Sequence, residues 1–369
     1  INFIIPQIEK IGMIPKLELM FSVMHLSDMQ CIFTINDIAK MAGVSKGTVS
    51  RVINDKIEGV GEEVRERVKH IIDEVGYKPN QLARSIVTSK SKTIGLIIPD
   101  ITNPFFPKLV RGIEDFAFSK GYTVFLCNSD EDTKKEEYYL CNFIEKRVDG
   151  IILAPSRKSS TKLNQLFSDY NRPFAIVDRQ IEGLNCDIFV SSDNIKGAYI
   201  GVSHLINQGY KNIVFLGGDK ELSNTKLRYE GYLKALDENA IKLNPEIVMY
   251  GQYTLGAGEE LMKELLNKQY EFDAIFAACD LIAIGAIRVL KEHSLKVPGD
   301  VAVMGYDNIY ISELIEPSLT TVEQKIYEIA SKVTQMLIQK IEGEAVLENK
   351  ILIEPQLIIR ETAIKANKV

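Results

Sequence analysis

Nine side chains suited to binding a small polyol follow short apolar segments in the long C-terminal part of the chain. Carboxylates and guanidinium groups form paired hydrogen bonds with neighbouring hydroxyls, and aromatic faces cover the C–H face of a sugar ring. The set predicts a carbohydrate pocket made by Asn103, Phe105, Phe106, Asp178, Arg179, Arg228, Tyr253, Asp280 and Asp307. Taken singly, an aspartate after a strand is often a helix cap, and either phenylalanine could be a core residue.

A second chemically suggestive stretch runs from Thr34 to Asn54. Apolar residues recur there at helical spacing on both sides of Gly43, and Thr34 and Ser45 are good N-caps. The exposed face of the second helix would consist of Lys46, Gly47, Ser50 and Arg51. This pattern predicts a helix-turn-helix whose second helix enters a DNA major groove. An ordinary helical hairpin with a solvated polar face is the alternative.

The nine pocket side chains need a scaffold, and the sequence predicts one of alternating strands and helices. The predicted strands are Thr93–Ile98, Thr123–Leu126, Gly150–Leu153, Phe174–Val177, Asn212–Leu216, Asp273–Ala277 and Val301–Gly305. The predicted helices are Lys108–Lys120, Lys134–Lys146, Lys196–Gln208, Lys226–Glu238 and Leu281–Glu292. This alternation is typical of doubly wound α/β folds with parallel sheets, and the number of strands favours two lobes. Such sheets bind ligands beyond the carboxyl ends of their strands, where the nine side chains are expected.

The motif AxxAGVSxxTVSRVIN, followed by GYKPNQLARSI, resembles the DNA-binding head and hinge of the lactose-repressor (LacI/GalR) family of bacterial transcription regulators. The resemblance extends from about Thr34 to Thr362. It implies an all-α helix-turn-helix head over residues 34–78, and a hinge helix with its linker over residues 79–92. It also implies DNA contacts from Lys46, Gly47, Thr48, Ser50, Arg51, Asn54, Arg84 and Ile86.

Two of these positions depart from the family pattern. Gly47 stands where other members read a base with a side chain, so the operator sequence stays open. Ile86 replaces a leucine that wedges into the minor groove in the family, and it keeps the apolar wedge while adding β-branching. The segment Pro79–Ile86 is too short to be a stable helix alone. The resemblance implies that it forms on DNA, paired with the hinge of a second subunit.

Residues 93–369 are similar to periplasmic sugar-binding proteins. The elements NPFF, VDR, Arg228, ACD and GYDN match the ribose-binding pattern, and IIPDITNPFF with VDRQIEGLNCDIFVSSD resembles the ribose-operon repressors most. The similarity implies one lobe over about residues 93–192 and 325–352, and another over about residues 193–324 and 353–369. A sugar between them is expected, with ribose first and another pentose or a hexose next.

Composition sets the broad class. The chain of 369 residues is 46% hydrophobic and 25% charged, which is typical of an ordered soluble protein with two or three domains. Its net charge is −6, yet residues 34–92 carry 11 Lys or Arg against 8 Asp or Glu. A basic head on an acidic body suits a protein that touches phosphate at one end.

The remaining observations concern location and residues 1–33. Five cysteines without CxxC spacing argue against a zinc site and favour a reducing cytoplasm. No uninterrupted apolar run reaches the ~18 residues needed to span a bilayer, so no membrane partner is expected. Residues 1–33 precede the family pattern and are treated as an extension of unknown role.

Enzymatic motifs are absent from the sequence. GxGxxG, GxxxxGK[ST], HExxH and GxSxG do not occur, and the four histidines are scattered, so neither catalysis nor a cofactor or metal is expected. Together with the resemblance, the sequence predicts a cytoplasmic, homodimeric, sugar-responsive repressor of a pseudo-palindromic double-stranded DNA operator. The resemblance implies that the sugar acts as inducer, and a corepressor is the alternative. The alternatives are an extracytoplasmic sugar receptor, which would not use residues 34–54, and a family regulator controlled by a purine or a carrier protein.

Overall fold

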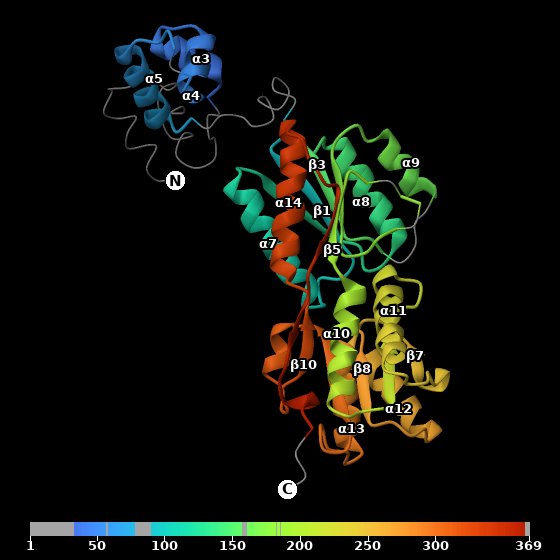
Figure 1. The fold of residues 1–369 in the computed structure, drawn as a ribbon. Coiled ribbons are helices and arrows are strands. Elements are labelled where there is room, and N and C mark those ends of the chain that lie inside the picture. Colours follow the sequence, from blue (N-terminus) through green and yellow to red (C-terminus); the bar gives the residue numbers. More distant parts are fainter. Residues whose placement is uncertain are drawn as a thin grey trace, which may run out of the picture. The chain divides into compact units, whose positions relative to one another are not determined.

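The computed structural model describes residues 33–56, 58–77, 90–156, 161–181, 183–184 and 186–365 (Figure 1). The chain separates into two compact units, residues 1–89 and residues 90–369, which we call the head and the body. Residues 79–89 of the predicted hinge and linker lie outside the described part of the chain, as do residue 78 of the predicted head and residues 1–32.

Three helices make up the described part of the head. They are α3 (Ile35–Ala42), α4 (Lys46–Ile53) and α5 (Glu62–Val75). Thr34 and Asp37 form a reciprocal capping box at the start of α3, in which the Thr34 amide donates to Asp37 Oδ2 at 2.9 Å. Gly43 ends α3 in the left-handed conformation, with φ +64°, which favours glycine. The predicted helix-turn-helix is therefore formed as expected.

The head has its own small core. Its buried members are Ile38, Ala39, Ala42, Val49, Val52 and Val68. One side of each helix contributes, because apolar residues at helical spacing fall on a single face. Since Val49 and Val52 fix the inward face of α4, the opposite face of that helix is left in solvent.

The body contains two six-stranded sheets. The first has the order β11-β5-β4-β3-β1-β2 and is entirely parallel. Its strands are β1 (Thr93–Ile98), β2 (Thr123–Asn128), β3 (Gly150–Leu153), β4 (Phe174–Val177), β5 (Ile188–Ser192) and β11 (Lys350–Ile353). Its helices are α7 (Phe105–Ser119), α8 (Thr133–Glu145), α9 (Thr161–Asp169) and α14 (Ile326–Glu342). We call this layered unit lobe 1.

The second sheet has the order β12-β10-β9-β8-β6-β7. Its strands are β6 (Ile213–Gly217), β7 (Val248–Tyr250), β8 (Ala274–Ala277), β9 (Ala302–Asp307), β10 (Thr320–Glu323) and β12 (Gln356–Ile358). Its helices are α10 (Asn194–Asn207), α11 (Ser223–Glu238), α12 (Leu255–Lys268) and α13 (Asp280–Glu292), with short 3-10 turns at Pro245–Ile247, Tyr310–Glu313 and Glu361–Ala363. Only the pairing of β10 with β12 is antiparallel, which is one exception to the expected parallel sheet. We call this unit lobe 2.

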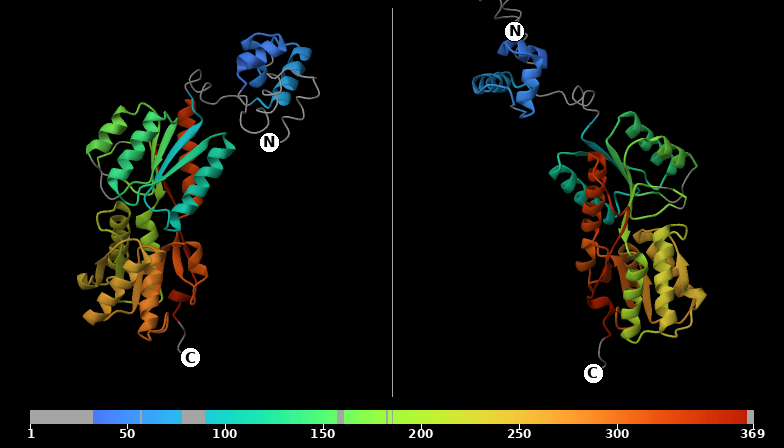
Figure 2. Two further views of the ribbon diagram at one scale, coloured as in Figure 1. Left: turned by 180° about the vertical axis from the view of Figure 1, so that it is seen from behind. Right: turned by 45° about the horizontal axis from the view of Figure 1, so that its top comes forward.

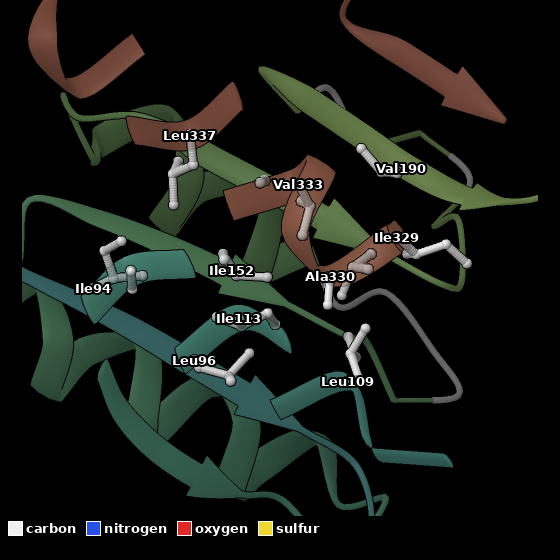
Figure 3. Close-up of a cluster of buried hydrophobic side chains, with 14 of the residues drawn as sticks. Ile94, Leu96, Leu109, Ile113, Ile152, Val190, Ile329, Ala330, Val333 and Leu337 are labelled. Carbon is white, nitrogen blue, oxygen red and sulfur yellow. The ribbon is translucent and has the colours of Figure 1, made fainter. Parts of the chain in front are cut away.

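Helices cover both faces of each sheet, so the central strands are buried, as their apolar sequences require, while edge strands such as β2 stay partly exposed. In lobe 1, α7 and α14 cover one face and α8 and α9 cover the other. Figure 3 shows the first of these layers, where Leu109 and Ile113 of α7 lie beside Ala330 and Val333 of α14 over the sheet. In lobe 2, α10 and α11 cover one face and α12 and α13 the other. Figure 2 shows the same arrangement from two further directions.

The chain crosses between the lobes three times. The crossings join β5 to α10, β10 to α14, and β11 to β12. Both lobes are therefore built from segments that lie far apart in the sequence. The two-lobed α/β body of parallel sheets matches the predicted fold class.

Candidate functional site

The exposed face of α4 carries the side chains that were predicted to contact DNA. Ser45 caps the helix by accepting a hydrogen bond from the Thr48 amide at 3.1 Å, and Val49 and Val52 are buried below. Exposed on the other side are Lys46, Gly47, Arg51 and Asn54, with Thr48 and Ser50 half-buried between them. The structure thus places these six residues along one short helix, from its first residue, Lys46, to its C-cap, Asn54.

The side chains of Lys46 and Arg51 differ from that of Asn54 in whether they form hydrogen bonds within the head. Among the described residues, neither cation has a hydrogen bond or an ion pair, so both remain available to phosphate or to a base edge. Asn54 is instead the C-cap of α4, and its side-chain Nδ2 donates to the Ser50 carbonyl at 2.7 Å. Arg84 and Ile86 lie outside the described residues.

A pocket lies between the lobes at the carboxyl ends of their strands. Its lining is Asn103, Phe105, Phe106, Asp178, Arg179, Asn224, Arg228, Tyr253, Asp307 and Gln324. Counting the part that opens to solvent, the space between them measures about 240 Å³. Eight of the nine side chains predicted from the sequence are in this lining, and they come from four separate strand ends and two helix starts.

Arg228 is the most thoroughly held side chain of the pocket. It is 2% exposed. Its Nε donates to Asn194 Oδ1 at 2.8 Å, and its Nη1 donates to the Ala278 carbonyl at 2.5 Å. Nη1 also lies 3.6 Å from Asp307 Oδ1, while the guanidinium stacks 3.9 Å from the centre of the Tyr306 ring. These contacts fix the orientation of a buried cation before any ligand arrives.

Arg179 occupies the matching position in lobe 1. Its Nη1 donates to Glu131 Oε1 at 2.8 Å and to the Pro155 carbonyl at 3.3 Å. Its Nε is 3.5 Å from Asp178 Oδ2, and this buried N–H has no hydrogen bond to the described residues. Because an unsatisfied buried donor is costly, Arg179 Nε is a donor that a bound ligand could satisfy.

Asp178 and Asp307 are the two carboxylates of the pocket. Burial raises the pKa of both groups, and the neighbouring guanidiniums, Arg179 for Asp178 and Arg228 for Asp307, oppose that rise. Both residues have positive φ, +69° and +115°, a backbone conformation that costs about 1–3 kcal/mol per residue and concentrates at functional sites. The fold therefore holds two strained acidic residues where a ligand would enter.

The aromatic lining has two parts. Phe105 and Phe106 begin α7 and meet edge to face, with ring centroids 5.0 Å apart. Both are also members of the lobe 1 core. The sequence left open whether these phenylalanines line a pocket or pack in the core, and in the structure they do both. In lobe 2, the Tyr253 hydroxyl is 2.7 Å from Thr225 Oγ1. Apolar and polar surfaces thus face the same space, as a sugar ring requires.

Asp280 is not brought into the pocket, in contrast to the sequence expectation. Its carboxylate accepts hydrogen bonds from the Ile309 amide at 2.9 Å, from Ser312 Oγ at 2.7 Å and from Thr321 Oγ1 at 2.5 Å. The side chain reaches under β9, where Gly305 leaves room because a Cβ there would collide with the Asp280 carboxylate. Asp280 therefore joins three segments of lobe 2 and does not line the pocket.

Two lining residues were missed. Gln324 follows β10, a strand that the sequence pattern did not reveal, and its Nε2 donates to Asp307 Oδ1 at 2.5 Å. Asn224 lies one helical turn before Arg228 on α11, so i, i+4 spacing could have identified it.

Other kinds of site find no support within the described ranges. No three His, Cys, Asp or Glu side chains gather closely enough to hold a metal ion. The described cysteines, Cys127, Cys141, Cys186 and Cys279, are free thiols. Among the same residues, no helix combines the length and apolar character that crossing a bilayer requires.

Comparison with known sequences supports both units. Residues 34–80 match the family described as bacterial regulatory proteins, lacI family, and residues 202–363 match the periplasmic binding protein-like domain. The transcriptional regulator RegA of Clostridium saccharobutylicum is 38% identical over 90% of this chain and 99% of its own. The ribose operon repressor of Halalkalibacterium halodurans is 38% identical over 89% and 96% of the two chains. The transcriptional repressor PurR of Pasteurella multocida is 34% identical over 89% and 98%.

Solved structures give the same picture. The lac repressor dimer bound to operator and an anti-inducer superposes with a TM-score of 0.81 at 26% identity, covering 90% of this chain and 99% of the other. A LacI family transcriptional regulator from Enterococcus faecium with bound ribose superposes with a TM-score of 0.67 at 31% identity, covering 74% and 100%.

Proposed function

Because the chain belongs to the lacI family of bacterial regulatory proteins, we propose that it is a cytoplasmic repressor that releases its operator when a small neutral sugar occupies the interlobe pocket. The chain is a DNA-binding transcriptional regulator by family, and its relatives are regulators rather than enzymes. The observation that carries the sugar proposal is the convergence of eight predicted side chains on one pocket.

DNA reading falls to α4 in this proposal. Two heads of a homodimer place their α4 helices in successive major grooves of a pseudo-palindromic operator. Arg51 is exposed and unpaired within the described head, and its guanidinium suits guanine O6 and N7. Gly47 offers no side chain, so Arg84 and Ile86 of the hinge supply further contacts, the latter as a minor-groove wedge.

The charges of the pocket favour a neutral ligand. Arg228 faces Asp307, and Arg179 faces both Asp178 and Glu131, so both guanidiniums already have anionic partners. A phosphate would have to displace these carboxylates, whereas hydroxyl groups can donate to them and accept from the guanidiniums at once. Ribose is the first candidate, which agrees with the ribose operon repressor and with the ribose-bound regulator.

A purine effector is the second candidate, because PurR proteins are among the relatives. Its support from the pocket is weaker. A flat base is held best between parallel aromatic faces, and Phe105 and Phe106 meet at 81° instead.

Regulation follows from differential binding to two states of the body. A sugar that contacts both lobes stabilises their closed arrangement, and the paired hinge segments then lose the geometry that fits the operator. A coupling of about 1–3 kcal/mol, or roughly 5- to 150-fold in operator affinity, is enough for such a switch.

The decisive experiment is a gel-shift titration of the full chain on a palindromic operator from its own gene region. D-ribose, D-xylose, D-glucose, hypoxanthine and guanine are added separately at 1 mM, on the order of typical effector levels. We expect operator release with ribose and none with the purines. Release by a purine alone would replace the sugar proposal with the second candidate, and failure to bind any palindrome would contradict the operator model.

A further inference from the structure

Residues 90–92, where the described body begins, are fastened to lobe 1 by two carboxylates. Asp149 is 3% exposed and accepts from the Ser91 amide at 2.8 Å, from Ser91 Oγ at 3.1 Å and from the Lys92 amide at 2.8 Å. The fourth donor is Arg172 Nη1, which donates to Oδ1 at 2.9 Å. One buried side chain therefore captures the backbone of two successive residues.

The second carboxylate is Glu342, the last residue of α14. It receives Lys90 Nζ at 2.6 Å, Lys92 Nζ at 2.7 Å and the Tyr122 hydroxyl at 2.6 Å. Lys92 Nζ also lies 4.2 Å from the centre of the Tyr122 ring. We call the contacts of Asp149 and Glu342 with residues 90–92 the linker clamp.

The linker clamp is attached to the same elements that carry pocket groups. Asp149 directly precedes β3, and two residues beyond that strand the Pro155 carbonyl accepts from Arg179. Arg172 lies just before β4, and Asp178 and Arg179 directly follow that strand. Two short strands thus join clamp residues at one end of the sheet to pocket residues at the other.

Helix α14 makes the third connection. Gln324 stands two residues before it, in the crossing from lobe 2, and donates to Asp307 in the pocket. Glu342 ends the helix at the clamp, 17 helical residues later. At a rise of 1.5 Å per residue, the helix spans about 25 Å along lobe 1 (Figure 1).

We propose that Asp149 and Glu342 are positioning residues that make residues 90–92 follow lobe 1, so that movement of lobe 1 on ligand binding reaches the DNA-binding head. This inference rests on the proposed function for its ligand, but the clamp itself does not depend on which ligand binds. Neither carboxylate lines the pocket, so their removal acts on transmission and leaves ligand recognition intact.

The test uses the full-length protein with Asp149→Asn, Glu342→Gln and, as a matched control, Glu344→Gln. Glu344 is an exposed acid two residues beyond Glu342, and its side chain makes no hydrogen bond or ion pair with the described residues. Operator affinity is measured by fluorescence anisotropy with and without D-ribose, and ribose affinity by calorimetry. We expect the two clamp variants to keep ribose affinity within about twofold, while the ratio of the two operator affinities falls by roughly fivefold or more.

Hydrogen exchange separates failure of the clamp from failure of the ribose proposal. In Asp149→Asn without ligand, one of the two amides of Ser91 and Lys92 should exchange at least tenfold faster than in the wild type, because the substitution replaces one of the two accepting carboxylate oxygens with an NH2 group. If ribose does not change the operator affinity of the wild-type protein, the ribose proposal fails. The hydrogen-exchange result then tests the linker clamp by itself. Unchanged exchange in Asp149→Asn, or an unchanged affinity ratio in both clamp variants of a ribose-responsive protein, would overturn the inference.

Discussion

Helix α4 of the head and the interlobe pocket hold their cations in opposite states. On α4, Lys46 and Arg51 are exposed and have no partner among the described residues. In the pocket, Arg179 and Arg228 are buried and already bonded to carboxylates and carbonyls. Under the proposed function, substitutions on α4 change DNA specificity at little cost in stability, whereas the pocket side chains also hold the body together.

Arg228→Ala should give the largest effect. It leaves Asp307 buried without its cation, so we expect a loss of about 3–5 kcal/mol of unfolding free energy together with the loss of ribose binding. Urea unfolding and calorimetry measure the two quantities. Lys226→Ala, an exposed site on the same helix, should change stability by less than about 0.5 kcal/mol. A folded Arg228→Ala protein with wild-type ribose affinity would show that Arg228 does not bind ribose.

Arg51→Ala should weaken DNA binding with little effect on stability, in contrast to Arg228→Ala. We expect operator binding to weaken by about 1–3 kcal/mol, the value of a bidentate contact with guanine, while the unfolding free energy stays within about 0.5 kcal/mol. Arg67→Ala on α5, also exposed, serves as the control for charge. If both substitutions weaken binding equally, Arg51 contributes only general attraction to phosphate.

Gly47→Ala should have a smaller effect of opposite sign. A Cβ at this position would meet only Ser45 Oγ, at the ordinary distance of 3.6 Å, and alanine favours a helix over glycine by about 0.5–1 kcal/mol. Thermal unfolding of the head should therefore show stabilisation. An accompanying loss of operator affinity would indicate that the DNA approaches the α4 backbone at Gly47.

Glu342 combines features of the two regions, because it is partly exposed, like the cations of α4, and hydrogen-bonded, like the cations of the pocket. Hydrogen bonds from Lys90, Lys92 and Tyr122 lower its pKa to about 2. A lowered pKa means that its contribution to stability is complete above about pH 4.5 and is lost as the pH falls toward 2. Carboxylate NMR titration should find this low midpoint, and Lys92→Met should move it upward. An unchanged midpoint in that variant would contradict the pairing.

Features of the fold that depend on interactions between residues close in sequence could be predicted from the sequence, and most features that depend on distant residues could not. The helix-turn-helix was predictable because caps such as Thr34 and a turn residue such as Gly43 act within a few positions. The strand-end rule predicted the pocket, since parallel strands bring their ends together wherever they lie in the chain. It failed at Asp280, whose orientation depends on Gly305, Ser312 and Thr321, all distant in sequence. It missed Gln324 because β10 carries no clear apolar pattern.

The three crossings between the lobes constrain synthesis of the protein. β5 must wait for its partner β11, which emerges from the ribosome about 160 residues later. At roughly 5–20 residues per second, that delay is on the order of 10 s. During this time the first sheet has an unpaired edge and lacks α14 over one face. The nascent chain therefore carries an incomplete lobe 1 while most of lobe 2, from α10 to β10, is synthesised, and this period is when a chaperone would be most useful to it.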